Sequence, residues 1–175
     1  MHLLFVCTGN ICRSPTGERL AAALNAQDPI DGFRASSAGT RAVIAHPVHS
    51  EAARVLVALG GDPAGFAARQ LRAAIATEAD LVLAMTREHR DAVLEIAPRQ
   101  LRRTFTLTEA AELVTQFDPA DVSELASRRS QLRADQIPDV PDPIGQDPEV
   151  FDRIGAQIAE LVAPIMEFCR RVSRG

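Results

Sequence analysis

Short apolar segments alternate with amphipathic ones along most of the chain. Strands are predicted over residues 2–6, 33–37, 81–85 and 104–107, and the run 81–85 is apolar throughout, which is typical of a strand buried on both faces. Between these segments, apolar residues recur every three or four positions, which predicts helices over residues 15–24, 50–59, 86–96, 109–113 and 148–172. Strands that alternate with helices predict an α/β fold in a single domain, residues 1–175, with a central four-stranded parallel sheet and helices on both faces.

The end of the first predicted strand is where a ligand is expected. Ligands of parallel α/β sheets bind beyond the carboxyl ends of the strands, which places residues 7–14 at a binding site. The stretch from Asp118 to Pro148 is rich in Asp, Arg, Ser and Pro and shows no clear period. We expect it to form an irregular rim of that site.

The composition is that of an ordinary globular protein, and it excludes several classes of function. The chain has 175 residues, 46% hydrophobic and 24% charged, and its net charge of −4 without a long basic run argues against nucleic acid as a partner. No apolar stretch is long enough to span a membrane, and the first residues predict a strand rather than a secretory signal. Three unevenly spaced cysteines fit a reducing cytoplasm. All 19 basic residues are arginine, which excludes Schiff-base chemistry and a Walker-type phosphate loop.

The segment with the most chemical information reads Cys7-Thr8-Gly9-Asn10-Ile11-Cys12-Arg13-Ser14-Pro15. A loop between a strand and a helix start turns its backbone N–H groups inward, and the positive end of the helix dipole adds to the nest that they form for an anion. We expect Gly9 to permit the backbone conformation of this turn and Pro15 to suit the start of the helix. A cysteine at such a place is favoured as a thiolate, which predicts covalent chemistry on a phosphate monoester.

Each residue of this segment receives an expected role. Cys7 attacks phosphorus in line to form a cysteinyl-phosphate, and Arg13 holds two phosphate oxygens with its planar guanidinium. Ser14 donates to the Cys7 sulfur and helps it to leave, while Asn10 braces the loop through side-chain hydrogen bonds. The backbone amides hold the remaining charge of the phosphate or a similar oxyanion. The expected substrate-binding residues are Thr8, Gly9, Asn10, Ile11, Cys12 and Ser14, with no metal and no other cofactor.

The nonapeptide resembles the signature of the low molecular weight protein tyrosine phosphatases. Further segments are similar to that family in its usual order, namely Ser37-Ala38-Gly39-Thr40, Ala68-Arg69-Gln70-Leu71, Asp80 to Met85 and Val140-Pro141-Asp142-Pro143. The resemblance covers essentially the full length. It implies a Rossmann-like fold of the phosphotyrosine protein phosphatase I type, metal-independent hydrolysis and a phosphorylated protein as the substrate. The oligomeric state stays open between a monomer and a weak dimer.

The leaving oxygen needs a proton, so a carboxylic acid is expected opposite the nucleophile. Asp-Pro occurs five times, and spacing does not choose among the five because Asp-Pro also opens ordinary turns. The resemblance selects Asp142, which lies just before the last predicted helix, where the family keeps its acid. Asp118 and Asp139 are the reserve candidates. Once deprotonated, Asp142 is expected to activate the water that hydrolyses the cysteinyl-phosphate.

Two features give opposite indications of the substrate. Ile11 matches the tyrosine type of the family, whereas members that act on phosphoarginine typically have threonine there. Ile144-Gly145 resembles the arginine type instead, because tyrosine-selective members usually have aromatic residues after the Asp-Pro. Ile11 belongs to the phosphate loop itself, so we expect protein phosphotyrosine or a small aryl phosphate as the substrate, with protein phosphoarginine as the alternative.

Two other classes fit the sequence less well. An arsenate reductase of the thioredoxin-coupled type needs two further redox cysteines in mid-chain, and there are none between Cys12 and Cys169. A non-catalytic phosphate-binding module is expected to have lost Cys7, Arg13 or Asp142, and all three are present.

The remaining polar residues have less specific expectations. Cys12 is either a small buried hydrophobe or, as the resemblance implies, the partner that captures oxidised Cys7 in a reversible disulfide. A zinc site of Cys7, Cys12, His46 and His49 is disfavoured by its spacing. We expect His46 and His49 on a loop beside the pocket or just before the next helix, and His2 and His89 at the surface. Arg69 is expected to be solvated or paired with a carboxylate, and Cys169 to lie in the core.

Overall fold

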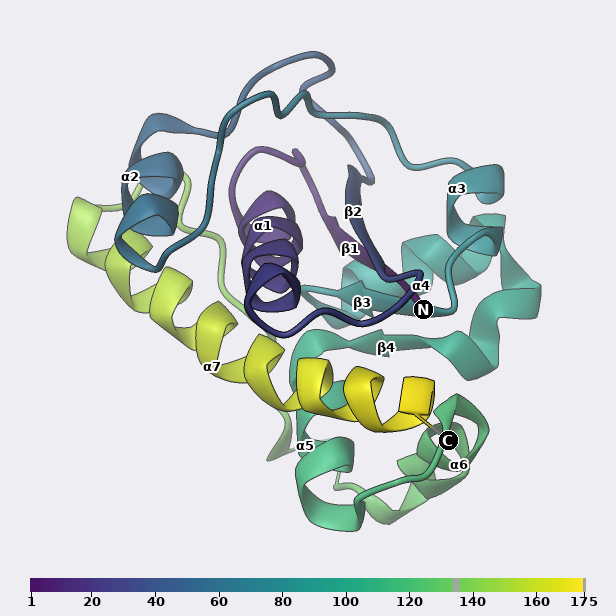
Figure 1. The fold of residues 1–175 in the computed structure, drawn as a ribbon. Coiled ribbons are helices and arrows are strands. Elements are labelled where there is room, and N and C mark those ends of the chain that lie inside the picture. Colours follow the sequence, from purple (N-terminus) through teal and green to yellow (C-terminus); the bar gives the residue numbers. More distant parts are fainter. Residues whose placement is uncertain (134–135, 175) are drawn as a thin grey trace.

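The four predicted strands form one parallel sheet in the computed structural model, which describes residues 1–133 and 136–174. The strands β1 (His2–Cys7), β2 (Arg34–Gly39), β3 (Leu81–Ala84) and β4 (Thr104–Thr106) lie in the order β2-β1-β3-β4 (Figure 1). Cys7 at the end of β1 lies opposite Gly39, and Val6 lies opposite Ala84. The carboxyl ends of the two inner strands therefore meet where the sequence predicts the binding site.

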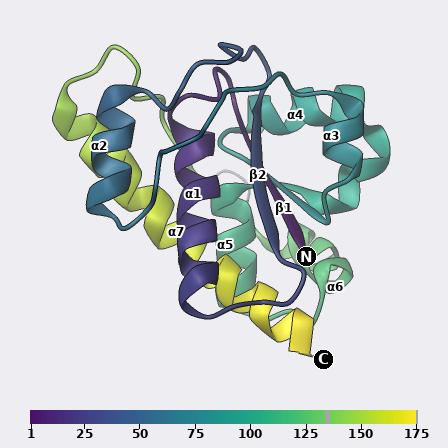
Figure 2. The same cartoon turned by 45° about the horizontal axis from the view of Figure 1, so that its top comes forward.

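Helices cover both faces of the sheet (Figure 2). One face carries α1 (Arg13–Gln27), α5 (Leu107–Phe117) and α7 (Pro148–Arg174), with α2 (Ser50–Ala58) packed against α1 and α7, and the other carries α3 (Ala73–Thr77) and α4 (Arg87–Ile96). The predicted α/β architecture, with four parallel strands between two layers of helices, is confirmed.

Alternate side chains of β1 enter two separate apolar cores. Leu3, Phe5 and Cys7 belong to the larger core, which also contains residues of α1, α5 and α7. Leu4 and Val6 belong to the smaller core under α3 and α4. Because both faces of β1 are buried, its sequence is apolar without alternation, as expected for an inner parallel strand.

Local capping interactions fix where several helices begin. Thr106 and Glu109 form a capping box at the start of α5, so this helix starts at Leu107 and replaces the end of the strand predicted over 104–107. Thr86 caps α4 by accepting a hydrogen bond from the backbone N–H of His89. The helix after the 7–14 segment starts at Arg13 rather than at Pro15.

Four short elements were not predicted: the helices α3 and α6 (Val122–Arg128) and the 3₁₀ turns η1 (Pro98–Arg103) and η2 (Arg129–Gln131). The stretch expected to be an irregular rim therefore contains a helix, capped by the Asp121 carboxylate on the N–H of Glu124. Within the described residues, no helix combines the length and the apolar character that crossing a membrane requires.

Candidate active site

Residues 7–14 form a tight loop between the end of β1 and the start of α1, here called the 7–14 loop. Asn10 has a left-handed backbone conformation with φ 55°, which Asn tolerates better than most residues. The expectation for Gly9 is wrong: a Cβ on Gly9 would meet its neighbours at ordinary van der Waals distances, beginning with Ile11 at 3.5 Å. The turn therefore depends on Asn10, whose side chain is fully buried.

The Asn10 side chain braces the loop, as predicted, and it also directs a proton toward Cys7. Its amide donates to the hydroxyls of Ser14 (2.9 Å) and Ser37 (2.8 Å), and its carbonyl accepts from the N–H of Arg69 (2.9 Å). Since the Ser14 oxygen accepts from Asn10, the Ser14 hydroxyl can donate to the Cys7 sulfur, 2.9 Å away. Cys7 itself is 2% exposed. This geometry suits stabilisation of a thiolate.

Across the described residues, no backbone amide of the 7–14 loop from Thr8 to Arg13 donates a hydrogen bond to a protein acceptor. Backbone N–H groups without protein partners at the start of a helix are the donors that bind a phosphate or sulfate. The loop therefore has the geometry of an anion site, with the Cys7 sulfur at its origin.

Arg13 makes contacts that the sequence does not predict. Its guanidinium is 4% exposed, and it donates through Nη1 to the Val140 carbonyl (3.0 Å) and through Nη2 to Asp142 Oδ2 (2.5 Å). Arg13 is also expected to hold phosphate, and its guanidinium has five N–H donors. A phosphate that takes the donors facing Val140 and Asp142 replaces these contacts.

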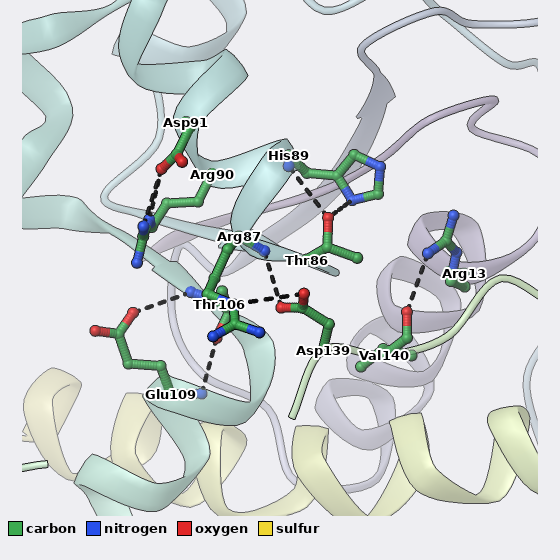
Figure 3. Close-up of polar contacts among 10 residues, drawn as sticks. All are labelled: Arg13, Thr86, Arg87, His89, Arg90, Asp91, Thr106, Glu109, Asp139 and Val140. Atoms are coloured by element: carbon green, nitrogen blue, oxygen red, sulfur yellow. Dashed lines mark hydrogen bonds and ion pairs between the residues drawn. The ribbon is translucent and has the colours of Figure 1, made fainter. Parts of the chain in front are cut away.

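The segment that carries Asp142 is held by the residue after β3 and by the start of α4. The N–H of Val140 donates to the Met85 carbonyl (2.8 Å), and Asp139 Oδ1 accepts from the N–H of Arg87 (2.9 Å; Figure 3). Both oxygens of Asp139 face Arg87, because Arg87 Nε lies 3.5 Å from Oδ2. Asp139 thus anchors the segment, and the half-exposed Asp142 is the carboxylate at the loop.

The second reserve acid lies at a different part of the chain. Asp118 ends α5 in a left-handed conformation with φ 45° and forms an ion pair with Arg171 of α7 at 2.5 Å. It takes no part in the contacts of the 7–14 loop.

A pocket of about 250 Å³ opens above Cys7 and Arg13. Its wall includes Ile11 and Ile144 and two residues that sequence reasoning missed, Arg41 and Val43. Both follow the carboxyl end of β2, where ligands of parallel sheets bind. Their position after a predicted strand could therefore have indicated them from the sequence. The other lining residues are Thr8, Gly9, Cys12 and Asp142.

Cys12 belongs to the 7–14 loop and to the lining of this pocket, and its side chain packs into a small core on the side of α2. This core also contains Val48, Ala52, Val55 and Phe151, and Cys12 is 4% exposed. Burial raises the pKa of Cys12 to about 12, with a further contribution from the neighbouring Cys7. Cys12 is therefore a thiol at neutral pH. Its role as a resolving partner for Cys7 stays a prediction.

Two histidines are buried, contrary to the expectation that they lie at the surface. His2 is 8% exposed and contacts the Ser36 hydroxyl (2.7 Å) and the Glu78 carbonyl (3.1 Å). His89 is 4% exposed and contacts the Thr8 hydroxyl of the 7–14 loop at 2.8 Å. Polar partners at both ring nitrogens allow these side chains to be buried.

The other histidines and Arg69 have structural contacts. His49 caps α2 by accepting from the N–H of Glu51 and stacks on Phe151, while His46 is exposed. Arg69 donates to the Ser37 carbonyl (2.7 Å), and no carboxylate of the described residues pairs with it. In residues 1–133 and 136–174, no group of three or more His, Cys, Asp or Glu side chains is placed to hold a metal ion. Cys169 lies in the core, as predicted.

Known proteins are similar to this chain in sequence and in fold. The model of a family described as low molecular weight phosphotyrosine protein phosphatase matches residues 2–174. The low molecular weight protein-tyrosine-phosphatase Etp of Escherichia coli is 39% identical over 117 residues, 67% of this chain and 76% of its own length. A protein-arginine-phosphatase of Geobacillus stearothermophilus is 38% identical over 108 residues, 62% of this chain and 70% of its own. The solved structure of a low molecular weight protein tyrosine phosphatase from T. tengcongensis has a TM-score of 0.77 and 32% identity, with 95% of this chain and 98% of that one covered.

Proposed function

We propose that this chain, which belongs to the low molecular weight phosphotyrosine protein phosphatase family, hydrolyses phosphate monoesters of protein tyrosine through a cysteinyl-phosphate on Cys7. The observation that carries the proposal is the Cys7 sulfur, 2.9 Å from the Ser14 hydroxyl, at the origin of a loop whose amides have no protein acceptor in the described chain. Arg13 and Asp142 face the same loop from α1 and from the 140–142 segment.

In the first step, the Cys7 sulfur attacks phosphorus in line. The S–P bond forms as the P–O bond to the leaving group breaks, and Asp142 gives a proton to the departing oxygen. Arg13 turns from Asp142 to the phosphoryl oxygens, where its fork and the loop amides stabilise the charge of the transition state. Binding of the phosphoryl group thus frees Asp142 for its role as the acid.

In the second step, water attacks the cysteinyl-phosphate. Asp142, now a carboxylate, accepts a proton from this water, the O–P bond forms and the S–P bond breaks. The Ser14 hydroxyl, held by Asn10, donates to the sulfur as the thiolate leaves. Inorganic phosphate is the product.

An aryl phosphate fits the wall of the pocket. The side chains of Ile11, Val43 and Ile144 give it an aliphatic lining, and Ile144 is 46% exposed at the rim. Such a lining accepts a phenyl ring by burial of apolar area. Phosphoarginine is the second candidate, because the relative from Geobacillus stearothermophilus carries that activity in its name and Ile144-Gly145 resembles its type.

The proposal is tested by measuring kcat/KM on one peptide that bears phosphotyrosine and on its counterpart that bears phosphoarginine. We expect preference for phosphotyrosine, and no turnover in Cys7→Ser or Arg13→Ala. Preference for phosphoarginine would make the Ile144-Gly145 rim the specificity determinant. Full activity in Cys7→Ser would contradict the mechanism for either substrate.

The proposal also extends to the organisation and location of the protein. We take residues 1–175 as one phosphatase domain, which is supported by the family match over residues 2–174. A cytoplasmic location is supported by three free cysteine thiols, which a reducing compartment preserves.

A further inference from the structure

A buried histidine of α4, His89, contacts the side chain of Thr8 in the pocket wall. The proposed mechanism gives the Thr8 hydroxyl no role. His89 Nε2 lies 2.8 Å from Thr8 Oγ1, across a sequence separation of 81 residues. Its other nitrogen, Nδ1, lies 2.9 Å from Thr86 Oγ1 at the N-terminus of α4 (Figure 3). A single imidazole therefore connects the start of α4 to the 7–14 loop.

The surroundings of His89 hold its ring neutral. Burial and the nearby positive charge of Arg13 lower the pKa of His89 to about 4, while Asp142 and Asp139 act in the opposite direction and Arg41 adds to the lowering. A neutral imidazole has one N–H donor and one acceptor nitrogen. The two hydrogen bonds to the threonines therefore run in one direction through the ring.

The hydrogen-bond partners of Thr86 favour one direction. Thr86 Oγ1 already accepts from the backbone N–H of His89 (3.2 Å), which favours its hydroxyl as the donor to His89 Nδ1 (2.9 Å). With Nδ1 as the acceptor, Nε2 carries the ring hydrogen and donates to Thr8 Oγ1. The hydroxyl hydrogen of Thr8 is then free, and Thr8 lines the 250 Å³ pocket.

From this arrangement we propose that His89 is a positioning residue, which fixes Thr8 so that the Thr8 hydroxyl donates to an anion in the pocket. The inference rests on the proposed function, because it assigns Thr8 to the same anion site as Cys7 and Arg13. The Thr8 backbone is fixed as well, since its carbonyl accepts from the N–H of Arg41 (2.9 Å). An anion then completes a directed chain of donors from Thr86 through His89 and Thr8.

Binding of inorganic phosphate, measured by titration calorimetry, tests the donor role of Thr8. Thr8→Val removes the hydroxyl and keeps the branched shape, and we expect about a tenfold weaker affinity, the effect of one hydrogen bond to a charged acceptor. Thr8→Ser keeps the hydroxyl and is expected to recover most of that loss. Equal phosphate affinity in the wild type and in Thr8→Val would overturn the proposal.

Two substitutions of His89 test whether it acts through Thr8. The amide nitrogen of Gln reaches the position of Nε2, so His89→Gln keeps a donor to Thr8, whereas the shorter Asn of His89→Asn reaches only Thr86. We expect His89→Asn to weaken phosphate binding as much as Thr8→Val does, and His89→Gln to recover most of the affinity. The double variant Thr8→Val/His89→Asn is expected to bind phosphate no more weakly than Thr8→Val alone.

If the losses of phosphate affinity in Thr8→Val and His89→Asn multiply in the double variant, His89 does not act through Thr8. This result would overturn the positioning role. Thermal unfolding of each variant shows whether a loss of affinity follows a loss of structure. Phosphate binding needs no turnover, so the result separates this inference from the proposed function. If the wild type hydrolyses its substrate but the variants bind phosphate as the wild type does, only the role of Thr8 and His89 is rejected. If the variants show the expected differences in phosphate affinity but the wild type hydrolyses nothing, only the proposed reaction is rejected.

Discussion

At the scale of single residues, Arg13 is the point on which the proposed reaction turns. Its guanidinium donates to the Val140 carbonyl and to Asp142, and the same guanidinium is proposed to hold the phosphoryl group. The Asp142 carboxylate and an incoming phosphate are both anionic, so they compete for one cation. Asp142 therefore has two proposed functions, to give a proton to the leaving group and to pair with Arg13. A substitution of Asp142 affects the two in different ways.

Asp142→Asn is expected to change turnover and product binding in opposite directions. Turnover falls by roughly 10²–10⁴ because the leaving oxygen no longer receives a proton. Phosphate binds about two- to fivefold more tightly, since removal of a half-exposed ion pair leaves Arg13 freer for it. Steady-state kinetics with phosphate as the inhibitor measures both quantities.

Asp139→Asn is the matched control for that substitution. Asn keeps an acceptor for the N–H of Arg87, so this variant is expected to retain most of the activity. A larger loss of turnover in Asp139→Asn than in Asp142→Asn would assign the acid to Asp139.

The buried neutral His89 makes the stability of the protein depend on pH. Its pKa is about 4 in the folded protein and near 6.5 in the unfolded chain, so the unfolded state binds more protons between these values. The contribution of His89 is complete above pH 6.5 and is lost as the pH falls toward 4, by up to about 3 kcal/mol. Urea unfolding from pH 4 to 7 is expected to show a weaker pH dependence in His89→Gln than in the wild type. Parallel curves for the two proteins would contradict a neutral buried ring.

At the scale of elements, the close contact between α2 and α7 holds the outer helices against α1. Gly155 of α7 faces Val55 of α2, and a Cβ on Gly155 would overlap the Val55 side chain. Val55 also packs with Cys12 in the small core behind the 7–14 loop. The distance between two helices is thus set by one glycine.

Gly155→Ala is expected to destabilise the protein by about 1–3 kcal/mol, because the overlap with Val55 exceeds the gain in helix propensity. Chemical denaturation measures the change in the free energy of unfolding. The double variant Gly155→Ala/Val55→Ala removes the overlap and is expected to be less destabilised than the sum of the two single variants. A single variant as stable as the wild type would show that α2 moves aside at no cost.

At the scale of the whole molecule, the anion site joins segments that are far apart in the sequence. The 7–14 loop, the start of α4 and the 139–142 segment meet at the carboxyl end of the sheet (Figures 1 and 3). A ligand that binds only this assembled site stabilises the folded state as a whole.

Phosphate at about one hundred times its dissociation constant is expected to stabilise the protein by about 2.7 kcal/mol. For a chain of 175 residues this corresponds to a rise in Tm of roughly 5–10 °C. Calorimetric or fluorescence melting measures the rise, and Arg13→Ala is the control, which is expected to lose most of it. An equal rise in Arg13→Ala would place the bound phosphate elsewhere.

The sequence predicts the sheet, the long helices and the 7–14 loop because each has a local pattern. It does not predict α3 and α6, because helices of five and seven residues are too short to show a period. The burial of His89 was also missed, since it depends on Thr8, 81 residues earlier. The contact between Arg13 and Asp142 is equally nonlocal, since the two residues are 129 positions apart. No local pattern in the sequence indicates it.

The order of the site residues along the chain has a consequence for biosynthesis. Cys7 lies in the first strand, whereas Asp142 comes just before α7, which covers α1. At about 5–20 residues per second, the ribosome adds Asp142 roughly 7–27 s after Cys7. During that interval the nascent chain has the proposed nucleophile but neither the proposed acid nor α7, which covers α1. We therefore expect hydrolysis at the full rate only after Asp142 and α7 have been added.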